Sequence, residues 1–500
     1  MSQSVLQSGK LFIGKSTKSE YLDLKFANRH GLITGATGTG KTVTLQGLAE
    51  GFSAAGVPVF AADIKGDLSG IAAVGEPKDF LVKRAAEVGL GADWKQQAFP
   101  AMFWDVFGVS GHPIRATVLD MGPLLLSRLL ELNETQEGVL NIAFRVAADE
   151  KMPVLDLKDL RALINSVAER SKELMAKYGN VATTSVGSIQ RRLLVLEEQG
   201  ADQFFGEPAL DIMDFMKVAP DGRGVISILS ADKLMEKPRL YSTFLLWMLT
   251  KLWQTLPEVG DIAKPKLVFF FDEAHLLFND APKALLERIE QIARLIRSKG
   301  VGVYFITQNP MDVPNSVSAQ LANRVQHALR AFTPQEQKAV KAAATTFRKN
   351  PDLDTEKVIM EMKVGEALVS TLENKGEPSM VQRTLIRPPE GRIGPVSLDE
   401  RQSVIEYSPV FGKYEDKLDR ESAYEMLTKR TETAAQEAGA AGGGGGWGDI
   451  IFGGGAPATG GKRQPAGMGE LIGKELKRSI TRTVATTIKN IIVGAIKGRR

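Results

Sequence analysis

A glycine-rich octapeptide near the N-terminus constrains this chain more than any other feature. It fits the phosphate-binding loop pattern G-x-x-x-x-G-K-[ST] without deviation. An apolar run, Leu32 to Thr34, precedes it as an expected strand, and a helical stretch, Val43 to Ala54, follows it. Backbone N–H groups of such a loop surround phosphates, and the start of the next helix adds partial positive charge. The pattern predicts a nucleotide site formed by Gly35, Ala36, Thr37, Gly38, Thr39, Gly40, Lys41, Thr42 and Val43.

Two side chains of this loop have expected chemical roles. Lys41 would reach the β- and γ-phosphates, and the hydroxyl of Thr42 would hold Mg²⁺. The predicted ligands are therefore ATP and Mg²⁺.

Composition excludes several other kinds of chemistry. The 500 residues include no cysteine, which excludes disulfides, cysteine-ligated zinc and thiol catalysis and is typical of a reducing compartment. The first ten residues have no apolar core of signal-peptide type, and no apolar run has the length needed to span a bilayer. We therefore expect a cytoplasmic protein.

The charge is unevenly distributed along the chain. From Lys462 to the C-terminus there are ten Lys and Arg against two Glu, a net charge of +8. Because the whole chain carries +4, the remainder carries −4. Contacts of the globular part with nucleic acid would therefore depend on a local basic patch rather than on bulk charge.

Apolar runs that alternate with helical patterns predict the fold class. The expected strands after the loop helix are 57–63, 103–107, 224–229, 267–271, 301–307, 325–332 and 366–372, with long helices at 240–256 and 283–298. Such alternation is typical of parallel βαβ units. The prediction is an α/β protein of the RecA-like P-loop type with a mostly parallel central sheet.

Five parts are expected along the chain. Residues 1–115 and 220–432 would form the two halves of the ATPase core, and 116–219, where apolar residues recur at helical spacing, a helical insertion. Residues 433–466 are rich in Gly and Ala and predict a flexible linker, and 467–500 predict a basic amphipathic helix. That helix could bind an anionic membrane surface, nucleic-acid phosphates or a protein partner, or it could pack on its own protein.

Polar residues at the ends of predicted strands are the candidate catalytic groups. Asp272 and Glu273 follow a continuous apolar strand, where the first would hold Mg²⁺ and the second would act as general base on water. Gln308 ends the next strand and could lie between that water and the γ-phosphate. Asp63 ends the strand after the loop helix, where it would join the magnesium shell or orient Lys41, or simply begin a loop.

Three segments resemble the HerA/FtsK superfamily of DNA-pumping ATPases, and most of all the bacterial HerA-like, YjgR-type family. They are residues 28–42 around the loop, residues 269–275 around Asp272 and Glu273, and residues 296–302 followed by 306–310, the last of which contain Gln308. The resemblance covers about residues 10–430. It implies a hexameric ring with DNA in its central channel, in which neighbouring subunits complete each ATP site with an arginine.

Two arginines are candidates for roles that the resemblance implies. Arg297 matches the position of the arginine that acts in a neighbour's site, and Arg29 is a candidate for a second arginine near the phosphates. A guanidinium there would stabilise charge on the γ-phosphate oxygens. Arg324 and Arg330 are weaker alternatives for these roles. The alternative explanation of Arg297 is structural, since a cation is favoured at the C-terminus of a helix.

The functional prediction is a Mg²⁺-dependent ATP hydrolase, a ring-shaped DNA translocase or helicase. The alternative is a P-loop ATPase that acts as a nucleotide-dependent assembly or signalling scaffold on protein or membrane. A metabolic kinase is disfavoured because Glu273 suits activation of water and no acceptor site is recognisable.

Overall fold

The computed structural model describes residues 5–279 and 283–441. The chain divides into two compact units, Met1–Glu432 and Thr433–Arg500. The predicted basic helix at 467–500 and the predicted linker beyond Ala441 lie outside the described residues. The first residues of that linker differ from the prediction, since helix α17 (Ala423–Ala441) includes them. Alanine is the best helix former, and it is frequent in this stretch.

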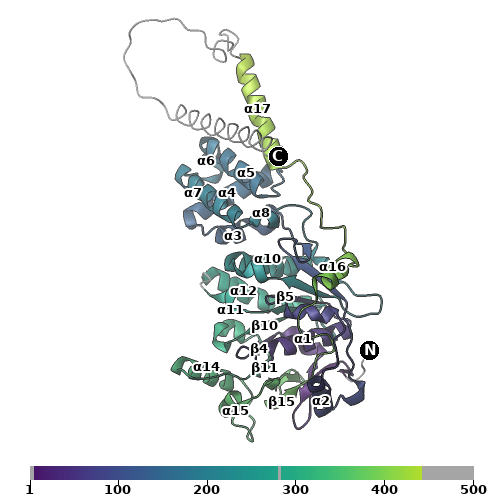
Figure 1. The fold of residues 1–500 in the computed structure, drawn as a ribbon. Helices are drawn as coiled ribbons and strands as arrows, with labels where there is room; N and C mark the ends of the chain where they lie inside the picture. The colour runs from purple at the N-terminus through teal and green to yellow at the C-terminus, as the bar shows by residue number, and fades with distance from the viewer. Residues whose placement is uncertain (1–4, 280–282, 442–500) are drawn as a thin grey trace, which may run out of the picture. The chain divides into compact units, whose positions relative to one another are not determined.

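A large mixed sheet of thirteen strands forms the centre of the fold (Figure 1). Its order is β1-β2-β15-β12-β11-β4-β10-β9-β5-β8-β6-β7, with β3 paired to β2. The strands are β1 (Leu6–Gln7), β2 (Lys10–Lys15), β3 (Ser19–Asp23), β4 (Gly31–Thr34), β5 (Val59–Asp63), β6 (Ala101–Asp105), β7 (His112–Pro113), β8 (Ile226–Ser230), β9 (Leu267–Phe271), β10 (Val301–Thr307), β11 (Asn323–His327), β12 (Glu366–Ser370) and β15 (Gln382–Ile386). A separate hairpin pairs β13 (Leu372–Glu373) with β14 (Glu377–Pro378).

From β11 to β7 every neighbouring pair of strands is parallel. This part confirms the predicted α/β class. β9 and β10 are buried along their whole length, as expected for strands covered on both faces. The other edge, made by β12, β15, β2, β1 and β3, is antiparallel, and the sequence pattern did not reveal it.

Helices cover both faces of the sheet. One apolar core joins α1 (Lys41–Ala54) to side chains such as Ala61, Phe270 and Ile306, while the other joins α10 (Pro238–Thr255) and α12 (Lys283–Ile296) to Phe60 and Phe271. Alternate residues of one strand enter opposite cores because strand side chains alternate between faces. The remaining helices outside the insertion are α2 (Asp79–Glu87), α9 (Asp232–Met235), α11 (His275–Phe278), α13 (Asn315–Ser318), α14 (Pro334–Thr345), α15 (Thr355–Glu361) and α16 (Leu398–Glu406).

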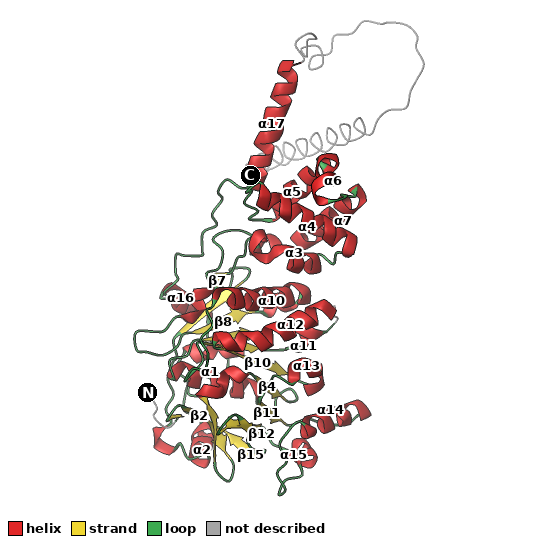
Figure 2. Ribbon diagram, turned by 180° about the vertical axis from the view of Figure 1, so that it is seen from behind, coloured by secondary structure: helices red, strands yellow, loops and turns green. Residues whose placement is uncertain are grey.

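The stretch between β7 and β8 is helical. Its helices are α3 (Val118–Leu129), α4 (Glu134–Asp149), α5 (Leu157–Glu169), α6 (Ser171–Tyr178), α7 (Thr183–Glu198) and α8 (Ala201–Phe204). Both views of the fold place α3 to α7 together, beyond α10 (Figures 1 and 2). Asn133 and Asp156 begin α4 and α5 with capping boxes, in which side chains satisfy N–H groups that a helix start leaves free. These helices fall within the predicted insertion, 116–219.

A buried ion pair ties the loop helix α1 to the segment after β15. Glu50 of α1 and Arg387 are each 1% exposed, and Glu50 Oε2 lies 3.6 Å from Arg387 Nη1. Glu50 also accepts backbone N–H groups from Glu390 at 2.8 Å and Gly391 at 2.9 Å. The C-terminal part of the core thereby fixes the helix that carries the phosphate loop.

One predicted strand ends earlier than expected. The prediction extended it over 325–332, but β11 ends at His327. Beyond that point the carbonyl of Ala328 accepts the N–H of Ala36, and the N–H of Leu329 bonds to Ile359. Beyond His327 the backbone therefore no longer pairs with a neighbouring strand, and it contacts the phosphate loop instead.

Candidate functional site

The glycine-rich loop connects β4 to α1 at the carboxyl edge of the parallel strands. Gly35 has φ 152° and Gly40 has φ 110°, values that residues with a side chain rarely adopt. A Cβ on Gly35 would lie 2.5 Å from Cβ of His327. Glycine is therefore required here by both backbone conformation and space. The exposed part of the loop, Thr37 and Gly38, and the exposed Thr42 at the start of α1 remain open to a ligand.

Lys41 folds back over its own loop. Its Nζ donates hydrogen bonds to the carbonyl oxygens of Gly35 at 2.6 Å and Ala36 at 3.1 Å. Burial lowers the pKa of Lys41, whereas the carboxylates of Glu273 and Asp272 act in the opposite direction. An ammonium group held by neutral carbonyls would gain stronger partners in the anionic oxygens of a phosphate.

Buried groups beneath the loop fix its shape. Nε2 of His327 lies 2.8 Å from Oγ1 of Thr44 in α1, and burial lowers the pKa of His327 to about 4. The imidazole is therefore neutral at pH 7 and adds no charge beside Lys41. The carbonyl of Thr39 accepts the N–H of Gly365 at 3.1 Å, which joins the loop to the start of β12.

Asp272 and Glu273 leave the end of β9 in a strained turn. Glu273 has φ 47°, in the left-handed region that costs a residue with a side chain about 1 kcal/mol or more. Oδ1 of Asp272 accepts the N–H of Glu273 at 2.9 Å, and its carbonyl accepts the hydroxyl of Tyr241 from α10 at 3.2 Å. Burial, together with the charge of Glu273, raises the pKa of Asp272 to about 6. A cation would relieve this cost of holding Asp272 ionised.

Gln308 bridges the loop and the carboxylate of Glu273. Its Oε1 accepts the hydroxyl of Thr37 at 3.1 Å, and its Nε2 donates to Glu273 Oε1 at 3.1 Å and Oε2 at 3.3 Å. His275 Nδ1 lies 3.4 Å from Glu273 Oε2 on the other side. The order β4-β10-β9 makes the three strand ends neighbours, so the structure brings together three groups that are far apart in the sequence.

Asp63 lies at the end of β5, beside Asp272. The parallel register pairs Ala61 with Phe270, and these two carboxylates each follow that pair by two residues. Oδ2 of Asp63 accepts the N–H of Leu68 at 3.1 Å. Burial raises the pKa of Asp63 to about 6, and the charge of Asp272 adds to this shift. The hydrogen bond fits the loop-starting role, and magnesium binding and orientation of Lys41 by Asp63 remain predictions.

Sequence reasoning missed Lys65, which follows Asp63 by two residues. Its side chain is exposed, and its charge acts on both Lys41 and Asp272. It missed His327 as well, since a lone histidine at the end of a largely polar strand carries no pattern. The signal for Lys65 was available in the turn sequence Asp63 to Asp67, directly after a buried strand.

The two candidate arginines lie at the amino ends of the parallel strands, whereas the site lies at their carboxyl ends. Arg29 precedes β4, and Arg297 precedes β10, whereas the site is at the other end of both strands. The seven residues of β10 span about 23 Å, more than an arginine side chain can cover. Burial lowers the pKa of Arg297, and the nearby charge of Arg29 adds to this effect. Neither arginine reaches the phosphate loop of its own chain. Of the weaker alternatives, Arg324 donates to the carbonyl of Ser318 and Arg330 to that of Met360.

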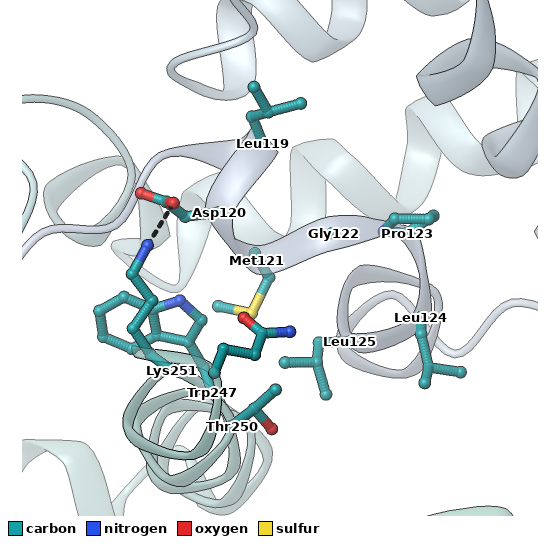
Figure 3. A pocket seen from close by; sticks show the side chains of 11 residues that line it. Leu119, Asp120, Met121, Gly122, Pro123, Leu124, Leu125, Trp247, Thr250 and Lys251 are labelled. Carbon is teal, nitrogen blue, oxygen red and sulfur yellow. Dashed lines mark hydrogen bonds and ion pairs between the residues drawn. The ribbon is translucent and has the colours of Figure 1, made fainter. Parts of the chain in front are cut away.

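A cavity in the described part of the chain is lined by other residues than this site (Figure 3). It has a volume of about 350 Å³ and lies between α3 and α10, where Met121 and Leu125 face Trp247 and Thr250. An ion pair of Lys251 and Asp120, 2.6 Å long, lies at its edge. Within 5–279 and 283–441, no helix is both long and apolar enough to cross a membrane.

Solved structures with a similar fold include the plasmid coupling protein TrwB in two nucleotide complexes. With the GTP analogue GDPNP, the TM-score is 0.51 at 13% identity, with 79% of this chain and 93% of TrwB covered. With the ATP analogue ADPNP, the TM-score is 0.50 at 14% identity, with 79% and 94% covered. VirB4 of Thermoanaerobacter pseudethanolicus matches at 14% identity over 76% of this chain and 97% of its own, with a TM-score of 0.49. The TrwB matches support the RecA-like P-loop fold at identities too low to carry function.

No curated protein matches the sequence. The model of the family described as "Helicase HerA-like C-terminal", by contrast, matches residues 10–500. This match confirms the resemblance that the three sequence segments indicated. The chain belongs to the helicase HerA-like C-terminal family.

Proposed function

We propose that this protein hydrolyses ATP with Mg²⁺ and uses the energy to move DNA. The observation that carries the ATP-hydrolysis part of the proposal is the bridge of Gln308 between the phosphate loop at Thr37 and the carboxylate of Glu273. The match to the helicase HerA-like family supports the DNA part. It supports a site in which the group that holds the phosphates and the group that activates water are coupled.

The residues divide the chemistry among them. Lys41 would exchange its two loop carbonyls for the β- and γ-phosphate oxygens. Glu273 would accept the proton of the attacking water, and the amide of Gln308 would orient that water. The Thr42 hydroxyl and the Asp272 carboxylate are oxygen donors of the kind that Mg²⁺ prefers, and the ion would neutralise charge on the β- and γ-phosphates. TrwB, a protein of similar fold, has been solved with ADP and Mg²⁺.

An arginine from a second copy would complete the site. Arg297 and Arg29 lie too far from their own loop but together at one edge of the sheet, which supports a role in a neighbouring subunit. We propose a ring, a hexamer by family resemblance, in which Arg297 reaches the γ-phosphate bound by the next chain.

A mixing experiment tests this arrangement. Arg297→Ala and Glu273→Gln should each bind ATP and hydrolyse it slowly. Mixed subunits should regain turnover, because interfaces form in which one chain supplies Glu273 and the other supplies Arg297. Lys41→Ala mixed with Glu273→Gln is the matched control, since both residues act in the same chain and no complete site results. Equal failure of both mixtures would contradict the shared site.

DNA dependence tests the motor function. Single- or double-stranded DNA should raise the rate of ATP hydrolysis several-fold. Turnover that is the same with and without DNA would favour the assembly scaffold, which also hydrolyses ATP but has no reason to respond to DNA.

A further inference from the structure

We propose that Lys65 is a second phosphate-contacting cation of this site and binds the terminal phosphate of ATP from the side opposite Lys41. The inference rests on the proposed nucleotide function and extends it, because it assigns recognition of the γ-phosphate to a loop outside the glycine-rich motif.

The strand order places Lys65 at the site. β5 is the neighbour of β9, and Ala61 pairs with Phe270. Asp63 and Asp272 each follow this pair by two residues, and the charge of Asp272 acts on Asp63. Lys65 follows two residues later, in the turn beside the magnesium candidate Asp272. Lys41 begins the helix after the β4 loop and Lys65 lies in the turn after β5, so the two cations act on Asp272 from different segments.

The turn that carries Lys65 is held rigidly. The carboxylate of Asp63 accepts the N–H of Leu68, so it closes the turn from inside. Gly66 has φ 78°, and the hydroxyl of Ser69 donates to the Gly66 carbonyl at 2.7 Å. Asp63 and Leu68 are buried, while Lys65 between them is exposed. This arrangement fixes the backbone and leaves the ammonium free to meet a ligand.

The charge of Lys65 is unmatched by a close partner. Within the described residues, its side chain makes no hydrogen bond or ion pair, although it acts electrostatically on Asp272 and opposes the charge of Lys41. Arg401 at the other flank differs, since it is engaged by the carbonyl of Ser110 at 3.0 Å and the hydroxyl of Ser230 at 2.9 Å. Lys41 and Lys65 are two cations that act on the same carboxylate, Asp272, and of the two Lys41 is held by loop carbonyls, so an anion bound here would meet both positive charges. A γ-phosphate carries the charge and the oxygens to meet both.

The test compares nucleotides with and without the terminal phosphate. Lys65→Met should weaken binding of a non-hydrolysable ATP analogue with Mg²⁺ by about tenfold or more, the loss expected for one hydrogen bond to a charged group. Binding of ADP with Mg²⁺ should change less than about twofold. Lys65→Arg should retain most of the affinity for the analogue, because it keeps the charge. Lys172→Met, which removes an exposed lysine from α6, is the matched control and should alter neither affinity.

Each outcome decides the proposal. Equal losses of affinity for the ATP analogue and for ADP, or no loss of affinity for either, would overturn it. An unchanged circular dichroism spectrum would show that the variant is folded. The result is distinguishable from failure of the proposed function. A wild-type protein that binds ATP but does not hydrolyse it would refute the enzyme while leaving the Lys65 comparison valid.

Discussion

Removal of Arg387 is expected to destabilise the protein in a pH-dependent way. Arg387→Met leaves the carboxylate of Glu50 buried without its cation, 3.6 Å from where the guanidinium had been. Breaking a buried ion pair from one side costs about 3–5 kcal/mol. The two backbone N–H groups that Glu50 accepts would remain, so the lower end of that range is the better expectation.

The pH dependence follows from Glu50. Burial raises its pKa to about 7, against the opposing effect of Arg387, so the folded chain binds this proton more tightly than the unfolded chain does. Stability from this group is therefore present below the unfolded pKa and lost as pH rises through about 7. Without Arg387 the pKa rises further, and each added unit costs about 1.4 kcal/mol at alkaline pH. The variant should lose most stability at pH 8.5. At pH 5.5 the loss should be only about 1–2 kcal/mol, because the only remaining cost is that of the hydrogen bonds removed with Arg387.

Urea unfolding at the two pH values measures this difference. The double variant Glu50→Gln with Arg387→Met should recover part of the loss at pH 8.5, since no charge is left buried. Arg145→Met, which breaks an exposed pair with Asp149, is the control and should shift the midpoint little at either pH. An equal shift at pH 5.5 and 8.5 would refute the role given to the Glu50 charge.

Two further predictions concern the site. Gln308→Ala should lower kcat by about 10²-fold and leave ATP affinity within about twofold, because the amide acts on water rather than on phosphate; steady-state kinetics would show this, and a rise in KM alone would contradict it. Gly35→Ala should lower stability by about 1–3 kcal/mol and abolish nucleotide binding, since its Cβ would meet His327 at 2.5 Å. Gly38→Ala, also at positive φ but with nothing within 4 Å, should be much milder in thermal unfolding, and equal effects would contradict the steric reasoning.

Sequence patterns predicted the local parts of the site well. The loop, its strand and its helix follow from contiguous residues, and the apolar run 267–271 ending in Asp272 indicated a strand end. Local sequence patterns do not predict which strands are neighbours in the sheet. The bridge of Gln308 depends on β10 lying between β4 and β9, and the nearness of Lys65 depends on β5 lying beside β9.

The antiparallel edge escaped prediction for a related reason. β2 and β15 are separated by more than 350 residues and pair through only a few of them, Lys15 with Leu385 and Gly14 with Ile386. Short strands with mixed burial give weak periodicity. The arginines are a different case, since their order before β4 and β10 already places them at the amino ends of those strands, away from the site.

The most direct test of the account is phosphate release by Glu273→Gln compared with the wild type. The amide is the same size as the carboxylate but cannot accept a proton from water. The wild type should hydrolyse ATP in the presence of Mg²⁺, whereas Glu273→Gln should bind ATP with nearly unchanged affinity and release phosphate at least about 10²-fold more slowly. Near-normal turnover by Glu273→Gln would contradict the assignment of Glu273 as general base and, with it, the coupled site on which the proposed function depends.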